Sequence, residues 1–168
     1  MKYLWCYETP IGRLTLVEEN GCVCHLLLNG QLPPPGCEPG ETDLLASVAT
    51  QLAEYFAGQR KSFDFPFVLR GTPFQETVWQ ALQTIPYGET RSYLEIARQI
   101  ERSTAARAVG MACARNPLPV IVPCHRVVGS NGCLTGYAGG QATKQLLLAA
   151  EQSCRTDSHP SSIRYVTN

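Results

Sequence analysis

The first part of the chain alternates apolar and polar side chains in the way typical of β-strands. Between Tyr3 and Leu28, stretches rich in Leu, Val and Tyr are separated by the turn sequences Thr-Pro-Ile-Gly at 9–12 and Glu-Asn-Gly at 19–21. This pattern predicts an antiparallel meander. The segment 32–40 follows with four prolines and two glycines, and its composition predicts a loop.

A helical period replaces the alternation after this segment. The apolar positions up to Gly58 recur three and four residues apart, which predicts one helix packed on the sheet. These positions are Leu44, Val48, Leu52, Tyr55 and Phe56. The segment 62–69 is apolar and aromatic around Pro66, and it fits either an edge strand or an interdomain linker.

A new helical region begins at Thr72, where a capping box with proline at the first helical position predicts a helix that runs to about Ile85. Ser92 opens a second capping box and a short helix that ends near Ile100. A further helix is expected from about Thr104 to Ala114. Two short helices joined by about four residues have the form of a helix-turn-helix. We therefore predict an N-terminal domain at 1–70, a C-terminal domain at 71–153 and a polar tail at 154–168.

The second helix of this pair consists mostly of side chains no larger than valine, with Arg107 as an exception. Small side chains permit close approach to another surface, which is either a neighbouring helix or a nucleic-acid groove. Pro117 and Pro119 then end the helix. The apolar run 120–122 predicts a short buried strand leading into Pro-Cys-His-Arg at 123–126, and a last helix is expected over 141–152.

Cys124, followed directly by His125, has the ingredients of an activated nucleophile. A thiol of pKa ~8.5 is only about 3% ionised at pH 7, whereas lowering the pKa by roughly two units gives about three-quarters thiolate. That shift corresponds to ~2.7 kcal/mol, which His125 and Arg126 are expected to supply. A histidine base needs a third group to fix its tautomer, and Glu151 on the last helix is the candidate. Taken without its neighbours, Cys124 is better explained as a small buried hydrophobe, because most cysteines are of that kind.

The charge of the chain gives little information about the kind of molecule that it binds. The chain has 14 basic residues (Lys and Arg) and 14 acidic residues (Asp and Glu). The net charge therefore does not indicate binding to nucleic acid. Five arginines nevertheless fall within 25 residues, which fits either a mildly basic face or an ordinary solvated surface. Eight cysteines without a signal-like N-terminal segment favour a reduced, cytoplasmic protein. The apolar runs are too short for membrane insertion.

Several sequence blocks together resemble one family. They are Arg-Ala-Val-Gly at 107–110, Asn-Pro at 116–117, Pro119, Ile-Val-Pro-Cys-His-Arg-Val at 121–127 and Gly-Tyr-Ala-Gly-Gly at 136–140. This region, 72–151, resembles the O6-alkylguanine-DNA alkyltransferases, also called methylated-DNA–protein-cysteine methyltransferases, and includes matching residues at Tyr93 and Lys144. The resemblance implies an α+β fold: a small RNase H-like N-terminal domain, then a mainly helical domain with a DNA-binding helix-turn-helix. Residues 1–70 match only in general form.

The resemblance also implies roles. Cys124 would accept the alkyl group, His125 would deprotonate it through a water, and Glu151 would orient His125. Asn116 would hold the turn around the site, and Tyr93 would help rotate the nucleotide out and donate toward the leaving guanine. The implied DNA contacts are Arg107, which fills the vacated base stack, with Tyr93, Ser92, Ala106, Arg126 and Thr104. The implied guanine and alkyl pocket consists of Tyr137, Ala138, Gly139, Val127 and Cys113.

The expected reaction is one irreversible transfer per molecule, with no cofactor and no metal. The expected partner is double-stranded DNA containing O6-alkylguanine, bound through the minor groove by a monomer in the cytoplasm with access to the nucleoid, or in the nucleus of a eukaryote. Gln152 and Ala150 depart from the family, which commonly has glycine and histidine there. Cys6, Cys22, Cys24 and His25 do not reproduce the zinc site of some relatives.

Three other functions fit parts of the sequence. A non-catalytic lesion binder would keep Arg107 and Tyr93 but replace the nucleophile, which is intact here. A cysteine hydrolase would use a similar thiol and histidine but would turn over and would not need the helix pair. A sequence-specific regulator would present long polar side chains on its second helix, where this chain has alanines.

Overall fold

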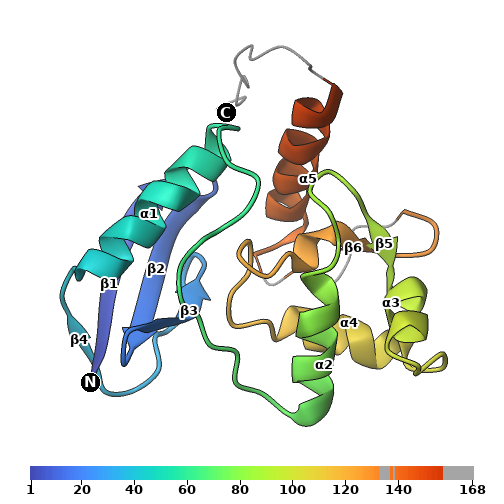
Figure 1. Ribbon diagram of the computed structural model, residues 1–168, viewed down its shortest axis with the longest axis horizontal. Coiled ribbons are helices and arrows are strands. Elements are labelled where there is room, and N and C mark those ends of the chain that lie inside the picture. Colours follow the sequence, from blue (N-terminus) through green and yellow to red (C-terminus); the bar gives the residue numbers. More distant parts are fainter. Residues whose placement is uncertain (133–136, 138, 157–168) are drawn as a thin grey trace. The chain divides into compact units, whose positions relative to one another are not determined.

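The computed structural model describes residues 1–132, 137 and 139–156. The chain divides into two compact units (Figure 1). The first unit consists of Met1–Val68 together with the chain from Ala149 onward, and the second is Leu69–Leu148. Within the described residues, no helix is both long and apolar enough to span a membrane.

The first unit contains the predicted meander. Strands β1 (Lys2–Thr9), β2 (Gly12–Glu19) and β3 (Cys22–Leu27) are antiparallel neighbours. A fourth strand, β4 (Cys37–Pro39), pairs parallel with β1, so the sheet order is β3-β2-β1-β4. The prediction of a loop throughout 32–40 was therefore wrong at β4. Proline is tolerated there because β4 is an edge strand, where a missing N–H interrupts no ladder.

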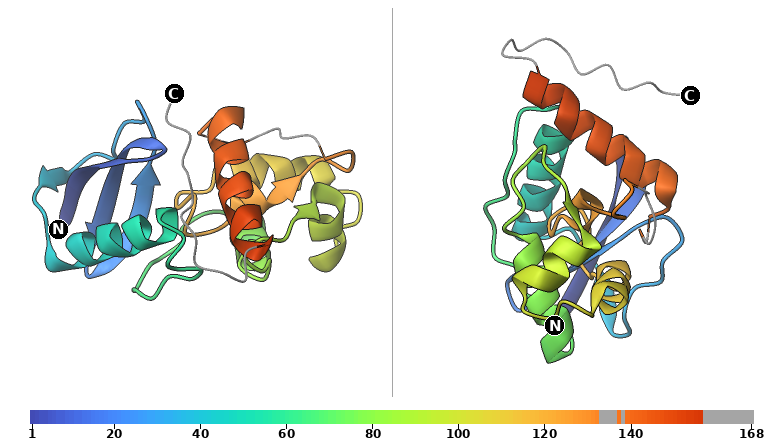
Figure 2. Two further views of the ribbon diagram at one scale, coloured as in Figure 1. Left: turned by 90° about the horizontal axis from the view of Figure 1, so that it is seen from above. Right: turned by 90° about the vertical axis from the view of Figure 1, so that its right-hand side faces the viewer.

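Helix α1 (Asp43–Phe56) confirms the predicted helix and lies along one face of the sheet (Figure 2). Thr42 caps it by accepting a hydrogen bond from the Leu45 N–H. The residues that α1 buries are Leu45, Val48, Gln51, Leu52, Tyr55 and Phe56. The segment 62–69 was expected to be either an edge strand or an interdomain linker. It pairs with the sheet at one position only, through a parallel bridge between Phe67 and Val23 of β3 with two backbone hydrogen bonds.

The second unit is mainly helical and begins with α2 (Pro73–Leu82), which carries the predicted capping box at Thr72 but ends three residues earlier than expected. Trp79 of α2 is buried, and its indole N–H donates to the Ala112 carbonyl at 2.8 Å. Ala112 lies in α4, so this bond ties the two helices together. Gly71 makes room for the indole, because a Cβ there would lie 2.5 Å from a Trp79 ring carbon.

The predicted helix pair consists of α3 (Tyr93–Gln99), with the Ser92 capping box, and α4 (Ala106–Ala114). The connection 100–105 is six residues long, two more than predicted, and Thr104 lies in a turn before α4 instead of inside it. The two helices therefore follow one another as predicted, but the connection between them is longer.

The strand predicted at 120–122 is wrong. The chain makes a tight turn in which the Val122 N–H donates to the Leu118 carbonyl at 2.8 Å and Val120 has a left-handed φ of 73°. A short 3-10 helix, η1 (Cys124–Arg126), follows. Strand β6 (Val127–Val128) then pairs parallel with β5 (Arg91–Ser92). Helix α5 (Gln141–Thr156) is longer than predicted, and its first part belongs to the second unit and its remainder to the first.

Candidate active site

Cys124 is held at the start of η1, in the interior of the second unit. Its backbone N–H donates to the Val122 carbonyl at 2.8 Å, and the Arg126 N–H donates to the Pro123 carbonyl at 3.0 Å. Cys124 is 2% exposed and His125 is fully buried. Because the two residues share one turn of 3-10 helix, they do not point to opposite sides as neighbours in a strand would.

The ionisation of Cys124 differs from the expectation. Burial raises the pKa of its thiol to about 11, against the lowered value predicted from the sequence. A hydrogen bond from the Asn116 side chain and the positive charge of Lys144 act in the opposite direction without overcoming burial. The resting protein therefore carries a protonated thiol at neutral pH, and a reaction at this sulfur needs its proton removed when the substrate is in place.

Asn116 connects the end of α4 to the turn before Cys124. Its side-chain amide donates to the Val122 carbonyl at 2.9 Å, and its side-chain oxygen accepts from the Leu118 N–H at 3.0 Å. Asn116 is buried, so both bonds form away from solvent. The carbonyl of Val122 also accepts from the Cys124 N–H, so this side chain fixes the backbone that carries the sulfur.

Lys144, to which the sequence assigned no role, lies on α5 and is 1% exposed. Its ammonium donates to the Tyr93 hydroxyl at 3.3 Å and lies 5.6 Å from the centre of the Tyr93 ring. Gly110 of α4 is close to the same ring, since a Cβ there would lie 3.7 Å from a ring carbon. Burial lowers the pKa of Lys144, and the neighbouring cysteines Cys124 and Cys113 act against that shift.

The signal that would have identified Lys144 is its place in the helical period. Lys144, Leu147, Leu148 and Glu151 follow the three- and four-residue spacing of a buried helix face, and all four are buried. Two ionisable side chains on an otherwise apolar stripe are costly unless they have partners, so they are candidates for a functional site.

Arg126 does not lie where the sequence placed it. Its side chain is buried, it donates to the Ile85 carbonyl at 2.8 Å, and its guanidinium lies 5.6 Å from the centre of the Tyr87 ring. These contacts tie the turn after Cys124 to the loop that follows α2. The predicted contact of Arg126 with DNA is therefore replaced by a structural role, because the guanidinium is turned into the protein.

The other predicted DNA contacts lie around α4 and the start of α3. Arg107 is exposed on α4, Ala106 is the first residue of that helix, and Thr104 is exposed in the preceding turn. Ser92 caps α3, where its hydroxyl accepts from the Glu95 N–H at 3.0 Å. Tyr93 is the first residue of α3 and the partner of Lys144.

The predicted pocket residues are mostly buried. Val127, Cys113 and Tyr137 are enclosed, and Gly139 is partly buried. Burial also raises the pKa of the Cys113 thiol, to which the nearby Cys124 contributes. Ala138 falls outside the described residues.

Glu151, the predicted partner of His125, is buried and belongs to the first unit, where its carboxylate accepts from the Tyr55 hydroxyl at 2.7 Å. His125 belongs to the second unit, so the relation between the two side chains stays a prediction. The Tyr55 hydrogen bond was not anticipated, because 96 residues separate the partners.

Two further features of the described residues concern ligands. No group of three or more His, Cys, Asp or Glu side chains there is arranged to hold a metal ion, and this includes the cysteines of the N-terminal strands.

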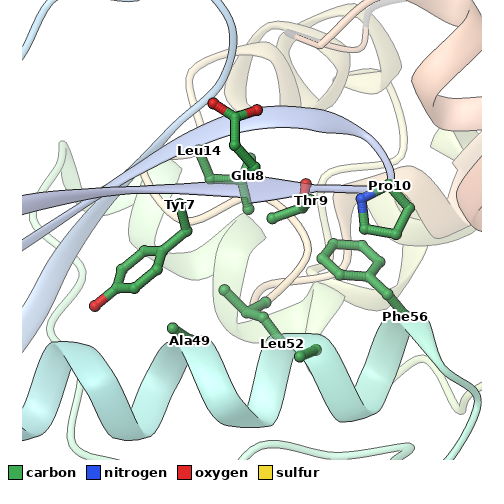
Figure 3. A pocket seen from close by; sticks show the side chains of 9 residues that line it. Tyr7, Glu8, Thr9, Pro10, Leu14, Ala49, Leu52 and Phe56 are labelled. Carbon is green, nitrogen blue, oxygen red and sulfur yellow. The ribbon is translucent and has the colours of Figure 1, made fainter.

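A pocket of about 190 Å³ lies in the first unit between the β1–β2 hairpin and α1 (Figure 3). Its lining is mainly apolar and includes none of the predicted site residues.

Comparisons with known proteins show the family to which this chain belongs. Residues 73–153 match the DNA-binding domain of 6-O-methylguanine DNA methyltransferase, and residues 2–69 match the ribonuclease-like domain of the same family. The constitutive methylated-DNA–protein-cysteine methyltransferase of Bacillus subtilis is 47% identical over 159 residues, which cover 90% of this chain and 96% of that protein. The chain belongs to the 6-O-methylguanine DNA methyltransferase family.

Other relatives support the same assignment. The methylated-DNA–protein-cysteine methyltransferase of Methanosarcina acetivorans is 46% identical, over 90% of this chain and 99% of its own length. The crystal structure of Mycobacterium tuberculosis OGT in complex with DNA matches with a TM-score of 0.86 and 47% identity, covering 90% of this chain and 94% of that one. The predicted fold class, a ribonuclease-like N-terminal domain and a helical DNA-binding domain, is confirmed.

Proposed function

We propose that the chain repairs O6-alkylguanine in double-stranded DNA by moving the alkyl group irreversibly onto the sulfur of its own Cys124. The observation that carries the proposal is the setting of this thiol. It is buried on a short turn that Asn116 braces, with the charge of Lys144 close enough to act on it, in a chain of a family named for this chemistry.

The raised pKa of Cys124 defines the first requirement of the reaction. With a pKa of about 11, only on the order of 0.03% of the thiol is ionised near pH 7.5. The proton must therefore leave as the sulfur attacks. His125, the next residue in η1, takes that proton through a bridging water, and Glu151 holds the resulting imidazolium. Asn116 and Lys144 stabilise the negative charge that develops on sulfur.

The transfer itself forms one bond and breaks one. The sulfur attacks the alkyl carbon, the bond from that carbon to O6 breaks, and its electron pair stays on the guanine. Tyr93 donates a proton or a strong hydrogen bond to the guanine as this charge appears. Lys144, which donates to the Tyr93 hydroxyl, makes the O–H a better donor because the ammonium stabilises negative charge on the phenol oxygen. The thioether product has no route back to a thiol.

The reacting carbon lies inside the duplex, so the nucleotide must leave the base stack at a cost of a few kcal/mol. Arg107, exposed on α4, fills the vacated space, and α4 enters the minor groove through its small side chains. Three residues contact the sugar-phosphate backbone of the DNA. Ser92 lies at the N-terminal end of α3, and Thr104 and Ala106 lie at the N-terminal end of α4.

The pocket for the extruded base is formed by Tyr137, Gly139 and Val127, with Cys113 beside the alkyl group. Ala138 belongs to the same predicted set. The protein acts as a monomer and without a cofactor. A cytoplasmic, reducing compartment suits the chemistry, because the acceptor must remain a thiol.

Reaction stoichiometry tests this proposal. Excess duplex with radiolabelled O6-methylguanine is mixed with wild-type protein, Cys124→Ser and Cys22→Ser, whose changed residue lies in β3 outside the proposed site. We expect wild type and Cys22→Ser to remove one methyl group per molecule and then stop, and Cys124→Ser to remove none. Continued turnover would indicate a hydrolase, and equal removal by all three proteins would place the acceptor elsewhere.

A further inference from the structure

Helix α4 exposes one large apolar side chain, Met111, which is 61% exposed. The helix buries Val109, Ala112 and Cys113 on its inner side. Its outer side carries Arg107, Ala108, Met111 and Ala114, and Arg115 follows at its C-terminal end; all five are exposed. Met111 is four residues after Arg107, so the two side chains lie on the same face about 6 Å apart along the helix axis.

Nothing in the helix itself requires methionine at this position. Lys, Gln and Glu have helix propensities close to that of Met and would avoid presenting apolar surface to water. The residue also has no role in the packing of α4, which Val109, Ala112 and Cys113 provide from the opposite side. An exposed, flexible apolar side chain is instead typical of a surface that contacts a partner.

The partner that fits this face is the DNA minor groove. The helix belongs to the region that matches a DNA-binding domain, and Arg107 and Arg115 place positive charge at either end of the face. Between them, Ala108 and Ala114 allow the backbone to approach closely, so Met111 projects furthest among the uncharged residues. Proteins that open the minor groove commonly insert apolar side chains, methionine among them, against sugars and between base steps.

We propose that Met111 is a second wedge on α4, which packs against deoxyribose and base edges one or two steps from the gap that Arg107 fills. The proposal rests on the proposed function. Arg107 replaces the extruded base, and Met111 holds open the adjacent, partly unstacked step. The side chain is therefore a positioning residue for repair in duplex DNA and has no contact with the reacting atoms.

The test compares Met111→Gln and Met111→Leu with wild type and with a change to glutamine at another exposed apolar residue of the second unit. Leu146 on α5 is 47% exposed and provides the matched control as Leu146→Gln. Each protein is assayed for the rate constant of repair in duplex DNA, for affinity to the duplex, and for the rate of reaction with the free base O6-benzylguanine.

We expect Met111→Gln to slow duplex repair about five- to tenfold, the loss that follows from removing partial apolar burial from the DNA-bound state. Met111→Leu should retain most activity, and reaction with the free base should be unchanged in both variants. Leu146→Gln should match wild type on both substrates. This combination separates a contact with DNA from a general effect of polarity on the helix surface.

Duplex repair by Met111→Gln at the wild-type rate would overturn the proposal. So would an equal loss on the free base, which would indicate damage to the catalytic site, or an equal loss in Leu146→Gln. Failure of the proposed function looks different, because wild-type protein itself would then leave the duplex unrepaired. In that case duplex affinity still decides whether Met111 contacts DNA, since Met111→Gln should bind several-fold more weakly than wild type.

Discussion

The pair of Lys144 and Tyr93 gives the sharpest prediction about how the site works. Replacing Lys144 by methionine keeps most of the side-chain volume and removes the charge that donates to the Tyr93 hydroxyl at 3.3 Å. A hydrogen bond to a charged group contributes about 1.5–3 kcal/mol. If this hydrogen bond stabilises the transition state in which Tyr93 donates to the leaving guanine, Lys144→Met should slow alkyl transfer about 10- to 150-fold.

A double-mutant cycle tests this reasoning. Tyr93→Phe, Lys144→Met and the double variant are compared in single-turnover transfer from O6-benzylguanine, which needs no base flipping. Because part of the effect of Lys144 passes through Tyr93, the double variant should lose less activity than the product of the two single losses, with a coupling energy of about 1.5 kcal/mol or more. The loss that remains when Lys144→Met is added to Tyr93→Phe reports the action of the Lys144 charge on the sulfur. Independent losses that multiply in the double variant would refute the pathway through Tyr93.

The same variant also tests the effect of Lys144 on the nucleophile. The positive charge of Lys144 lowers the pKa of Cys124, so its loss should raise that pKa further above the wild-type value of about 11. Alkylation of Cys124 by iodoacetamide as a function of pH, followed by peptide mapping, measures this shift. The free energy of unfolding of each variant, measured by urea titration, provides the control that separates this effect from a loss of folded protein.

The remaining predictions concern the turn and the surface. Asn116→Ala leaves the buried Leu118 N–H and Val122 carbonyl without their side-chain partner and should lower the free energy of unfolding by about 2–4 kcal/mol in a urea titration; a change under 0.5 kcal/mol would contradict the bracing role. Arg107→Ala should slow repair in duplex DNA far more than reaction with O6-benzylguanine, and equal losses on the two substrates would reject the wedge. Duplex affinity should fall as salt concentration rises, because phosphate contacts release counterions; an affinity independent of salt would contradict the DNA-binding surface.

The local patterns in the sequence predicted the elements that depend on local physics. The capping boxes at Thr72 and Ser92 begin α2 and α3 as expected, because they satisfy backbone donors within the same turn. The helix at Asp43–Phe56 follows from its apolar spacing. These features need no information about distant parts of the chain.

The errors concern features that depend on partners distant in sequence. Strand β4 forms through pairing with β1, more than thirty residues earlier, and its own composition favours a loop. The run 120–122 is apolar enough for a strand, but the two hydrogen bonds of Asn116 fold it into a turn. The resemblance implied that Arg126 contacts DNA, whereas the Ile85 carbonyl and the Tyr87 ring hold its side chain inside the protein.

In the candidate site, too, the sequence predicted what depends on local residues and missed what depends on distant parts of the chain. The motif around Cys124 identified the nucleophile, but the pKa of the thiol depends on burial, which the motif does not contain. The expectation of a lowered pKa was therefore wrong. Lys144, which α5 brings close to Cys124, received no role from the sequence. Its spacing with Leu147 and Glu151 on one face of α5 was the available indication.

The most direct test of the account is the intact mass of the protein after mixing with duplex DNA that contains O6-methylguanine, followed by peptide mapping. We expect one added methyl group per molecule, located on Cys124, with no further gain when more DNA is supplied. An unchanged mass despite binding to the damaged duplex, or a methyl group on another residue, would contradict the assignment of Cys124 as the acceptor.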